Sequence, residues 1–473
     1  MKTYDELSIC WLRQDLRLTD NPALTKSLES NNVLVIYILD DVNSKDNKMG
    51  GSSRWWLHRS LENLNEKLDN KISFYSGNPS DIFSELSSRL NIKKVYWNRC
   101  YEPWRIKRDI VLKKLLLDKG IKVNSYNSNL LWEPNQILKS DKTPYKVFTP
   151  YYRKGCLNHS SPRMPINKPN LENIIKDEKN NNLEDLCLLD KFKWYSKFEN
   201  LWTPGEDSAY LKFNKFLENG LNGYRNGRNF PEKENVSQLS PHLHFGEISP
   251  NQIWYELDEK FNNYPEKDIN HFKSELGWRE FSYYLNFHFP DLNNKNLQTK
   301  FDAFPWENDS KLLNAWKKGV TGYPIVDAGM RELWQTGYMH NRVRMIVGSF
   351  LVKNLLIDWK KGERWFWDCL IDADLASNSA SWQWVAGTGA DAAPYFRIFN
   401  PILQGSKFDP NGNYTRKFIP ELNKVPVKYL FNPWEAPEDL LLEAGVILGV
   451  NYPKPIVDIK DSRNKALESF SML

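Results

Sequence analysis

The 473-residue sequence has little cysteine and histidine and no long hydrophobic run. Its five cysteines are scattered and never spaced C-x-x-C, which predicts reduced, mostly buried thiols and argues against a bound metal or an iron–sulfur cluster. No apolar run approaches the roughly 18 residues that a membrane-spanning helix needs, and the first residues lack the charged-then-apolar order of a signal peptide. A cytoplasmic protein without membrane contact is therefore expected. A G-x-G-x-x-G segment is also missing after the first apolar run, which excludes an ordinary dinucleotide fingerprint.

Tryptophan is the most unusual component, with 19 residues beside only 7 histidines. Tryptophan usually fills cores, but it also forms stacking surfaces and takes part in redox chemistry, and composition leaves both interpretations open. The net charge is only +5, so a phosphate-binding face would require local clustering of Lys and Arg.

The length predicts two or three domains. Short apolar runs alternate with helix-like stretches over residues 1–130, which predicts a doubly wound parallel α/β domain. The proline-rich, irregular stretch 131–201 predicts a long interdomain connector. Residues 202–473 show helical periodicity and predict an all-α domain, with one continuous helix over 340–359. Buried strands are expected at 8–13, 33–40, 71–76, 94–100 and 121–126.

Two segments of the helical half group polar side chains with small residues. Ser237 and Ser240 stand in a turn before a helical stretch, where hydroxyls and free N–H groups either cradle a pyrophosphate or simply cap the helix. Asp374, Asn378 and Trp382 recur at i, i+4 among alanines and serines. The small residues on such a face would let either a flat ring or a neighbouring helix pack closely against the backbone.

Candidate site residues in two other segments also share helix faces. Asn341, Arg344 and Met345 lie at i, i+3 and i+4, and Arg344 could pair with Asp372 to neutralise an otherwise costly buried charge. Elsewhere, Glu275 and Trp278 are three residues apart on one predicted helix with Arg279 next to them. A Glu–Arg surface pair there would contribute little to stability.

These segments and several others resemble the signatures of the photolyase/cryptochrome family, in family order over nearly the whole chain. The resemblance implies an enzyme, a carbon–carbon lyase that uses FAD, active as FADH⁻, to repair cyclobutane pyrimidine dimers in UV-damaged DNA by light-driven electron transfer. The segments are WLRQDLRLTDNPAL (11–24), WTPGEDSAYLKF (202–213), LSPHLHFGEISP (239–250), ELGWREF (275–281), TGYPIVDAGMREL (321–333), MHNRVRMI (339–346), DADLASNSASWQW (372–384) and GTGADAAPYFRIFNP (387–401).

The resemblance also implies roles for individual residues. Trp278 would stack on the flipped-out dimer, Glu275 would hydrogen-bond its Watson–Crick edge, and Asn378 would face the flavin N5 atom. A relay that reduces the flavin would consist of Trp306, Trp359 and Trp382. The implied FAD contacts are Tyr224, Val236, Ser237, Gln238, Leu239, Ser240, Phe272, Arg279, Asn341, Arg344, Asp372, Ala373, Asp374 and Asn378. The implied DNA contacts are Arg228, Glu275, Trp278, Asn341, Arg342, Met345, Arg397 and Gln404.

Three alternatives within the family are a cryptochrome-type blue-light receptor, a (6-4) photoproduct photolyase and a single-strand-specific DASH-type cryptochrome. Asn378 resembles the photolyases, because plant cryptochromes carry Asp and animal cryptochromes carry Cys at this place. Asn341 and Met345 stand where (6-4) photolyases have histidines, which favours the cyclobutane dimer. We expect no long signalling extension after the helical half, and a monomer without an obligate protein partner.

A second, light-harvesting chromophore is expected with the first domain, and its identity stays open. The WNR-x-x-EP pattern with Glu102 resembles deazaflavin-binding members, but Cys100 and His244 depart from that pattern. Arg105 stands where folate-binding relatives place a carboxylate. Deazaflavin, methenyltetrahydrofolate, another flavin and no chromophore are all compatible with these residues.

Overall fold

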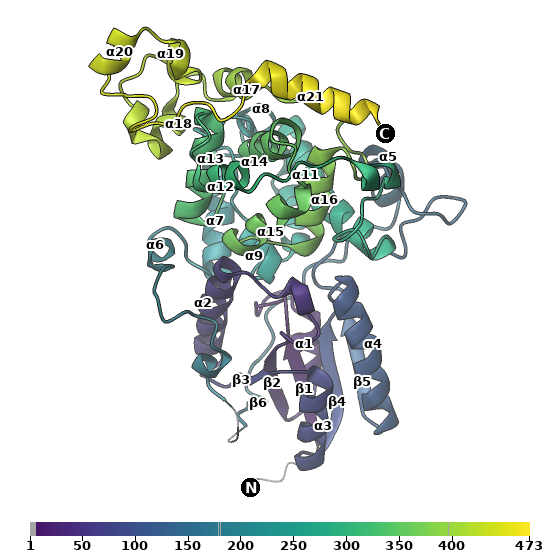
Figure 1. The fold of residues 1–473 in the computed structure, drawn as a ribbon. Coiled ribbons are helices and arrows are strands. Elements are labelled where there is room, and N and C mark those ends of the chain that lie inside the picture. Colours follow the sequence, from purple (N-terminus) through teal and green to yellow (C-terminus); the bar gives the residue numbers. More distant parts are fainter. Residues whose placement is uncertain (1–5, 178, 180, 396) are drawn as a thin grey trace. The chain divides into compact units, whose positions relative to one another are not determined.

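The computed structural model of the chain describes residues 6–177, 179, 181–395 and 397–473. Its contacts divide the chain into two units (Figure 1). Unit 1 comprises Met1–Glu218 and Ser237–Pro290, and unit 2 comprises Asn219–Val236 and Asp291–Leu473. None of the helices in the described part of the chain combines the length and apolar character that crossing a membrane requires. None of the five cysteines is in a disulfide bond, and four of them are buried, as predicted.

Unit 1 contains a parallel sheet in the order β3-β2-β1-β4-β5. Its central strands β1 and β2 are buried along their whole length, because helices cover a parallel sheet and make such strands continuously apolar. The doubly wound α/β prediction is therefore confirmed. The strands are β1 (Leu7–Leu12), β2 (Val33–Leu39), β3 (Ser73–Ser76), β4 (Ile92–Asn98) and β5 (Lys122–Tyr126).

The helices of unit 1 include four that connect successive strands of the sheet, α1 to α4, and α11, which is the longest of the unit. Figure 1 shows α1, α3 and α4 beside the sheet. The helices are α1 (Pro22–Ser27), α2 (Gly51–Lys67), α3 (Pro79–Arg89), α4 (Pro103–Asp118), α5 (Phe148–Pro150), α6 (Ser196–Glu199), α7 (Glu206–Asn219, whose last residue belongs to unit 2), α9 (Ser240–Phe245), α10 (Pro250–Glu259) and α11 (Glu266–His288).

The described part of the stretch predicted to be irregular, 131–201, contains several short elements, among them α5 and α6. A π-helical turn spans Tyr151–Cys156, directly after α5, and the two-residue strand β6 (Ile174–Ile175) pairs with β2. Two residues are too few to show alternation, and a wide helical turn has no periodicity of its own in the sequence. These elements could therefore not be predicted.

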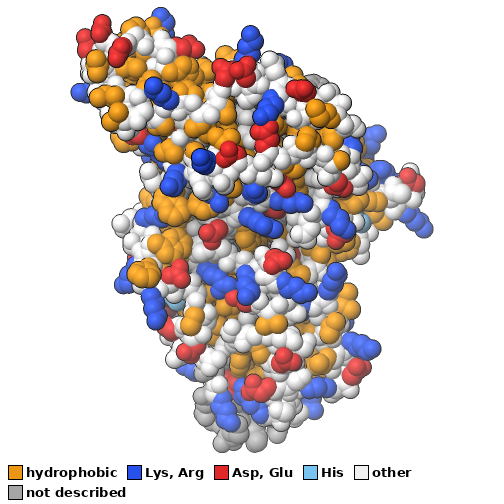
Figure 2. Space-filling model, viewed as in Figure 1, with side chains coloured by type: hydrophobic (Ala, Val, Ile, Leu, Met, Phe, Trp, Pro, Cys, Tyr) orange, Lys and Arg blue, Asp and Glu red, His pale blue; other side chains and the backbone are white. Residues whose placement is uncertain are grey.

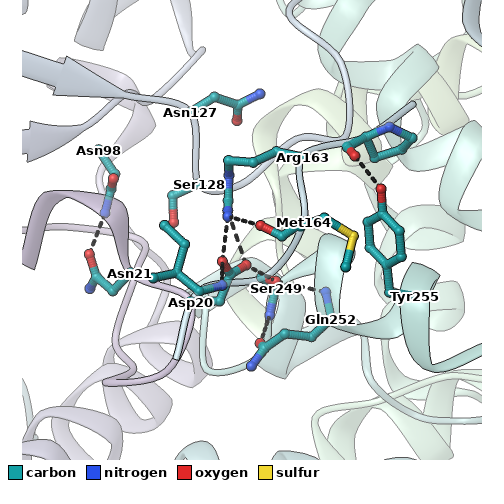
Figure 3. Close-up of polar contacts among 12 residues, drawn as sticks. Asp20, Asn21, Asn98, Asn127, Ser128, Arg163, Met164, Ser249, Gln252 and Tyr255 are labelled. Carbon is teal, nitrogen blue, oxygen red and sulfur yellow. Dashed lines mark hydrogen bonds and ion pairs between the residues drawn. The ribbon is translucent and has the colours of Figure 1, made fainter. Parts of the chain in front are cut away.

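Asp20 anchors this connector inside unit 1 (Figure 3). Its buried carboxylate accepts hydrogen bonds from Arg163 at 2.5 and 3.0 Å and from the hydroxyl of Ser249 at 2.5 Å. The N–H of Ile166 donates to the same carboxylate at 2.9 Å. A buried charge is stable only when it is paired and hydrogen-bonded, so these bonds fix the connector to the loop after β1 and to the start of α10.

The described residues of unit 2 form helices around one large apolar core. The predicted helix 340–359 is wrong in its second half. Its regular part ends at Ser349, a π-helical turn follows, and Leu356 adopts a left-handed φ of 48° that a helix cannot continue through. Asp358 then caps the next helix through the N–H of Lys360 at 3.0 Å. The helices are α8 (Tyr224–Gly227), α12 (Ser310–Lys318), α13 (Pro324–Thr336), α14 (Asn341–Ser349), α15 (Trp359–Cys369), α16 (Leu375–Ala386), α17 (Pro401–Phe408), α18 (Asn413–Phe418), α19 (Val427–Leu430), α20 (Glu438–Glu443) and α21 (Ile459–Ser471).

Candidate functional site

Helix α16 places the predicted flavin-facing side chains in unit 2. Asp374 is its N-cap and accepts the N–H of Ser377 at 2.7 Å, so this carboxylate satisfies one of the helix's unpaired donors. Asn378 is buried, and its Nδ2 donates to the backbone carbonyl of Glu363 at 3.1 Å. The bond fixes the orientation of the carboxamide. Ala373 is also buried, and its side chain is a single methyl group.

Glu363 is a residue that the sequence did not single out. It lies on α15, it is buried, and its carboxyl is hydrogen-bonded by the hydroxyl of Ser379 on α16. Burial raises the pKa of Glu363 to about 7, against the opposing effect of the Ser379 hydrogen bond. A carboxyl that titrates near neutrality therefore lies in the same network as Asn378. No spacing in the sequence links Glu363 to Asn378, because they belong to different helices.

Arg344 and Asp372 form the predicted ion pair. One guanidinium nitrogen lies 2.8 and 3.2 Å from the two carboxylate oxygens, and Nε donates to the carbonyl of Met339 at 2.7 Å. The Asp372 side chain is 2% exposed and that of Arg344 25% exposed. The guanidinium also lies 5.3 Å from the ring centre of Tyr338. The pairing compensates for the burial of the carboxylate.

The donor set around α16 fits a flavin. Carboxylates at Asp372 and Asp374, the carboxamide of Asn378 and the guanidinium of Arg344 offer both acceptors and donors to the N–H and carbonyl groups of an isoalloxazine ring. Tyr224, on α8 in the same unit, is buried beneath the guanidinium of Arg228, which lies 5.6 Å from its ring centre. Among the described residues no three His, Cys, Asp or Glu side chains group as metal ligands would.

The predicted pyrophosphate loop runs from the last residue of the first segment of unit 2, Val236, into unit 1. Gln238 adopts a left-handed φ of 52°, which is uncommon outside glycine, and the next residue, Leu239, returns to the right-handed region. Successive residues of opposite hand turn their N–H groups toward one point and form a nest for an anion. Lys212 donates to the side chain of Gln238 at 3.2 Å, and Ser237 Oγ accepts the N–H of Leu239 at 3.4 Å.

Helix α11 carries the predicted lesion-contacting residues of unit 1, and Glu275 and Trp278 lie on it as predicted. Glu275 lies 3.8 Å from the imidazole of His271. Arg279 instead donates to the backbone carbonyl of Asn129 at 2.7 Å, so it contacts the segment just before the connector. Phe272 is buried, with its ring 4.7 Å from that of Phe216.

The arginines predicted to contact DNA form a cationic cluster in unit 2. Arg342 hydrogen-bonds Asn229, its guanidinium lies 4.4 Å from the ring centre of Phe408, and it approaches the Met345 sulfur at 3.6 Å. The pKa of Arg342 is lowered by burial and then by the like charges of Arg228 and Arg397. Arg397 is exposed, Gln404 lies half-buried on α17, and Asn341 is the exposed first residue of α14.

For the prediction of DNA contacts, the local grouping of these arginines matters more than the total charge of the chain. Figure 2 shows Lys and Arg side chains interspersed with Asp and Glu on the visible face, as a net charge of +5 implies. Like charges brought close together cost free energy unless an anion neutralises them. The proximity of these like charges is compatible with the prediction that they contact DNA phosphates.

The three tryptophans of the predicted relay differ in burial within unit 2. Trp382 and Trp359 are 3% and 1% exposed, whereas Trp306 is only partly buried. Gly362 lets α15 approach the indole of Trp382, because a Cβ there would come within 2.2 Å of the ring. Trp359 donates its indole N–H to Asn296 at 2.9 Å. Trp382 and Trp359 are thus both enclosed in the core, and of the three only Trp306 is partly exposed.

The carboxyl ends of β1, β2 and β4 carry a network of ion pairs. Arg13 contacts Asp109 at 2.5 Å, and Arg108 contacts Asp40 at 3.2 Å and Asp109 at 2.8 Å. In α/β sheets a ligand binds outside the carboxyl ends where the strand order reverses, here between β1 and β4. Of the residues that bear on the second chromophore, Glu102 and Arg105 pair with each other, and Cys100 is buried.

The chain is similar to known proteins over almost its full length. A family model described as DNA photolyase matches residues 8–170, and one described as the FAD binding domain of DNA photolyase matches residues 272–472. A deoxyribodipyrimidine photo-lyase from Agrobacterium fabrum is 47% identical over 98% of this chain and 97% of that protein. Cryptochrome-2 from Arabidopsis thaliana is 37% identical over 99% of this chain and 79% of that protein. The crystal structure of a class III photolyase from Agrobacterium tumefaciens superposes with a TM-score of 0.93, at 46% identity, covering 100% of this chain and 98% of that one.

Proposed function

Because the chain belongs to the DNA photolyase family, we propose that it is a light-dependent carbon–carbon lyase that splits cyclobutane pyrimidine dimers in UV-damaged DNA. The observation that carries this proposal is the 47% identity to a photo-lyase for pyrimidine dimers over 98% of the chain. The cryptochrome comparison gives a lower identity of 37%, so the alternative of a light receptor is not favoured.

The cofactor of this family is FAD, and in its reduced form FADH⁻ it would supply the light-driven electron transfer that splits the dimer without net redox change. The N–H groups of 237–240 would hold its pyrophosphate, with the Gln238 side chain anchored by Lys212. Arg344 would hold Asp372 in place for the ring. Asn378 would face the ring with its carboxamide oriented by the Glu363 carbonyl.

Recognition of the lesion would divide between α11 and the cationic cluster. Trp278 stacks on the extruded dimer and Glu275 hydrogen-bonds its polar edge, which discriminates damaged from intact DNA. Arg228, Arg342 and Arg397 contact phosphates, which gives affinity without sequence information. Extruding the dimer costs a few kcal/mol, and less than for an intact pair because the damaged pair is already weakened.

A repair assay on defined DNA tests the proposal. A duplex with one thymine dimer is incubated with the protein, illuminated with blue light, and digested at a restriction site that the dimer blocks. We expect restored cleavage only after illumination. Repair of a (6-4) photoproduct but not of the dimer, repair confined to single strands, or no repair by enzyme with reduced flavin would each overturn the assignment.

We also propose the domain organisation, the location and the oligomeric state that accompany this function. Residues 1–130 would form the antenna domain with a second chromophore, 131–201 the connector, and 202–473 the FAD-binding domain. The protein would act as a cytoplasmic monomer without an obligate protein partner. Sedimentation of the purified protein with and without dimer-containing DNA tests the monomer, and an absorption spectrum of freshly purified protein identifies the second chromophore.

A further inference from the structure

We infer that Phe148, in the connector, is a positioning residue for Trp278. It holds the indole of Trp278 in the orientation in which a flipped-out base can stack on it. This inference rests on the proposed function, because it concerns how the dimer is bound. The connector is thereby part of the lesion site and does not only join the two halves of the chain.

Phe148 and Trp278 form a close parallel stack. Their ring centres are 3.8 Å apart and their planes differ by 12°. A third ring, that of Tyr152, lies 5.5 Å from Phe148 with planes 9° apart, so three parallel rings follow one another. Phe148 covers one face of the half-buried indole, and a base therefore stacks on the opposite face. Parallel, offset rings are the arrangement that aromatic stacking favours.

The backbone on both sides of the stack is adapted to this close approach. Glycine is unfavourable inside a helix, yet Gly277 lies in the middle of α11 next to Trp278. A Cβ at Gly277 would come within 2.6 Å of the Tyr152 ring, so only glycine lets the connector approach α11 this closely. Tyr152 belongs to the π-helical turn, and turns of this kind occur frequently at functional sites.

Further contacts of unit 1 fix the connector on α11. The ring of Tyr151 lies 4.6 Å from that of Tyr284 and 5.0 Å from that of Phe281. The N–H of Tyr145 donates to the hydroxyl of Tyr284 at 2.9 Å. These buried aromatic residues hold the connector segment that carries Phe148 in place. Phe148 therefore restricts the movement of the Trp278 side chain that stacks on it.

A rigid Trp278 side chain favours lesion binding, because a mobile side chain would have to become ordered when the dimer binds. A partly exposed indole that samples several rotamers loses that freedom when the dimer stacks on it, and the loss weakens binding. Holding the ring beforehand removes the loss. The effect concerns only DNA that stacks on Trp278, so it increases the discrimination between damaged and undamaged DNA.

The test compares Phe148→Leu, which keeps apolar volume but removes the stack, with Phe148→Tyr, which restores the ring. Phe287→Leu serves as a matched control because Phe287 lies on α11 outside the stack. Dissociation constants are measured for dimer-containing and undamaged oligonucleotides. For Phe148→Leu we expect lesion binding about 3- to 10-fold weaker with undamaged-DNA binding unchanged. Phe148→Tyr and Phe287→Leu should both behave as the wild-type protein does.

A double variant separates positioning from other effects. If Phe148 acts through Trp278, then adding Phe148→Leu to Trp278→Leu causes no further loss, whereas independent effects would multiply. Flavin absorbance and the thermal midpoint report folding, and Phe148→Met replaces Phe148→Leu if that variant does not fold. Unchanged or tighter lesion binding, equal losses on both DNAs, or multiplied losses would each overturn the inference.

The outcomes also separate this inference from the function on which it rests. If Trp278→Leu abolishes discrimination while Phe148→Leu has no effect, only the positioning role of Phe148 is wrong. If Trp278→Leu leaves discrimination unchanged, the stacking role of Trp278 itself is wrong. Absence of light-dependent repair by the wild-type protein would instead contradict the proposed activity.

Discussion

The Arg344 guanidinium lies 2.8 Å from one carboxylate oxygen of Asp372 and 3.2 Å from the other, which joins α14 to the segment just before α16. Both residues were predicted to pair, because a buried carboxylate without a cation would be too costly. The pair therefore couples the stability of unit 2 to the side chains proposed to face the flavin.

Breaking this pair should be far more damaging than breaking an exposed one. Arg344→Ala leaves the buried carboxylate without its cation and should lower the free energy of unfolding by about 3 kcal/mol, toward the lower end for buried pairs because Arg344 is partly exposed. Denaturant titration with flavin release as a second readout measures this. Lys295→Ala, which removes a pair whose side chains are 73% and 68% exposed, is the control and should cost less than about 1 kcal/mol. Equal costs would show that the buried pair has no special role.

Trp278→Ala should weaken binding of dimer-containing DNA by about 10- to 100-fold, because stacking contributes roughly 1–3 kcal/mol per base. Binding of undamaged DNA should change little, since phosphate contacts do not involve the indole. Fluorescence anisotropy with both oligonucleotides measures the difference. Trp194→Ala, in a 37% exposed connector tryptophan, should leave both affinities unchanged. A parallel loss on the two DNAs would contradict the stacking role.

Arg342→Ala and Arg397→Ala should each reduce the slope of log K against log salt by about 1, because one neutralised phosphate fewer releases fewer counterions. The measurement is a series of binding constants between low and physiological salt. Arg463→Ala changes an exposed arginine on α21 and should leave the slope as it is. Unchanged slopes for both Arg342→Ala and Arg397→Ala would place the phosphate-binding face elsewhere.

Trp306→Phe should block light-driven reduction of oxidised FAD, because phenylalanine keeps the bulk of the ring but is much harder to oxidise than an indole. Repair by chemically pre-reduced enzyme should persist, since the relay loads the electron and does not take part in dimer splitting. Transient absorption under blue light follows the reduced flavin. Trp434→Phe, in a partly buried tryptophan against the core, is the control. A long-lived reduced flavin at the wild-type yield would point to a different donor, such as Trp384.

The buried Glu280 should make the protein less stable as the pH rises. Burial raises the pKa of this carboxyl to about 7, although Arg279 and two backbone N–H groups act in the opposite direction. The folded protein therefore retains a proton that the unfolded chain releases above its ordinary pKa of 4.5, so stability falls between about pH 4.5 and 7 and then levels off.

Glu280→Gln removes this ionisation and should raise the thermal midpoint at pH 8 by about 2–5 °C, with little change at pH 5. The pH dependence should be reduced but not abolished, because burial also raises the pKa values of Glu332 and Glu363 to about 7. Scanning calorimetry at the two pH values measures the effect. Glu443→Gln, at an exposed position, should change neither midpoint. A midpoint that falls at pH 8 would show that the Glu280 carboxylate stabilises the fold.

Sequence patterns predicted the local elements well where burial is uniform along an element. The strand predicted at 33–40 is observed at Val33–Leu39, because a strand covered on both faces is a continuous apolar run. The helix predicted at 340–359 was wrong beyond Ser349, because the π-helical turn and the left-handed Leu356 depend on packing in the core. The site was predicted where one contiguous motif contains its residues, as with Asp374 and Asn378.

By itself the sequence determined the parallel sheet, the helical half and the family, because periodicity and contiguous motifs are properties of neighbouring residues. Only the tertiary structure decided that Phe148 lies against Trp278, that Glu363 meets Asn378, and that the arginines gather in one cluster. These relationships join residues from separate segments, and a stacked ring or a shared hydrogen bond between distant segments leaves no periodic trace in either of them. The physical reason is that the free energy of such contacts depends on distance in space, which a single sequence does not record.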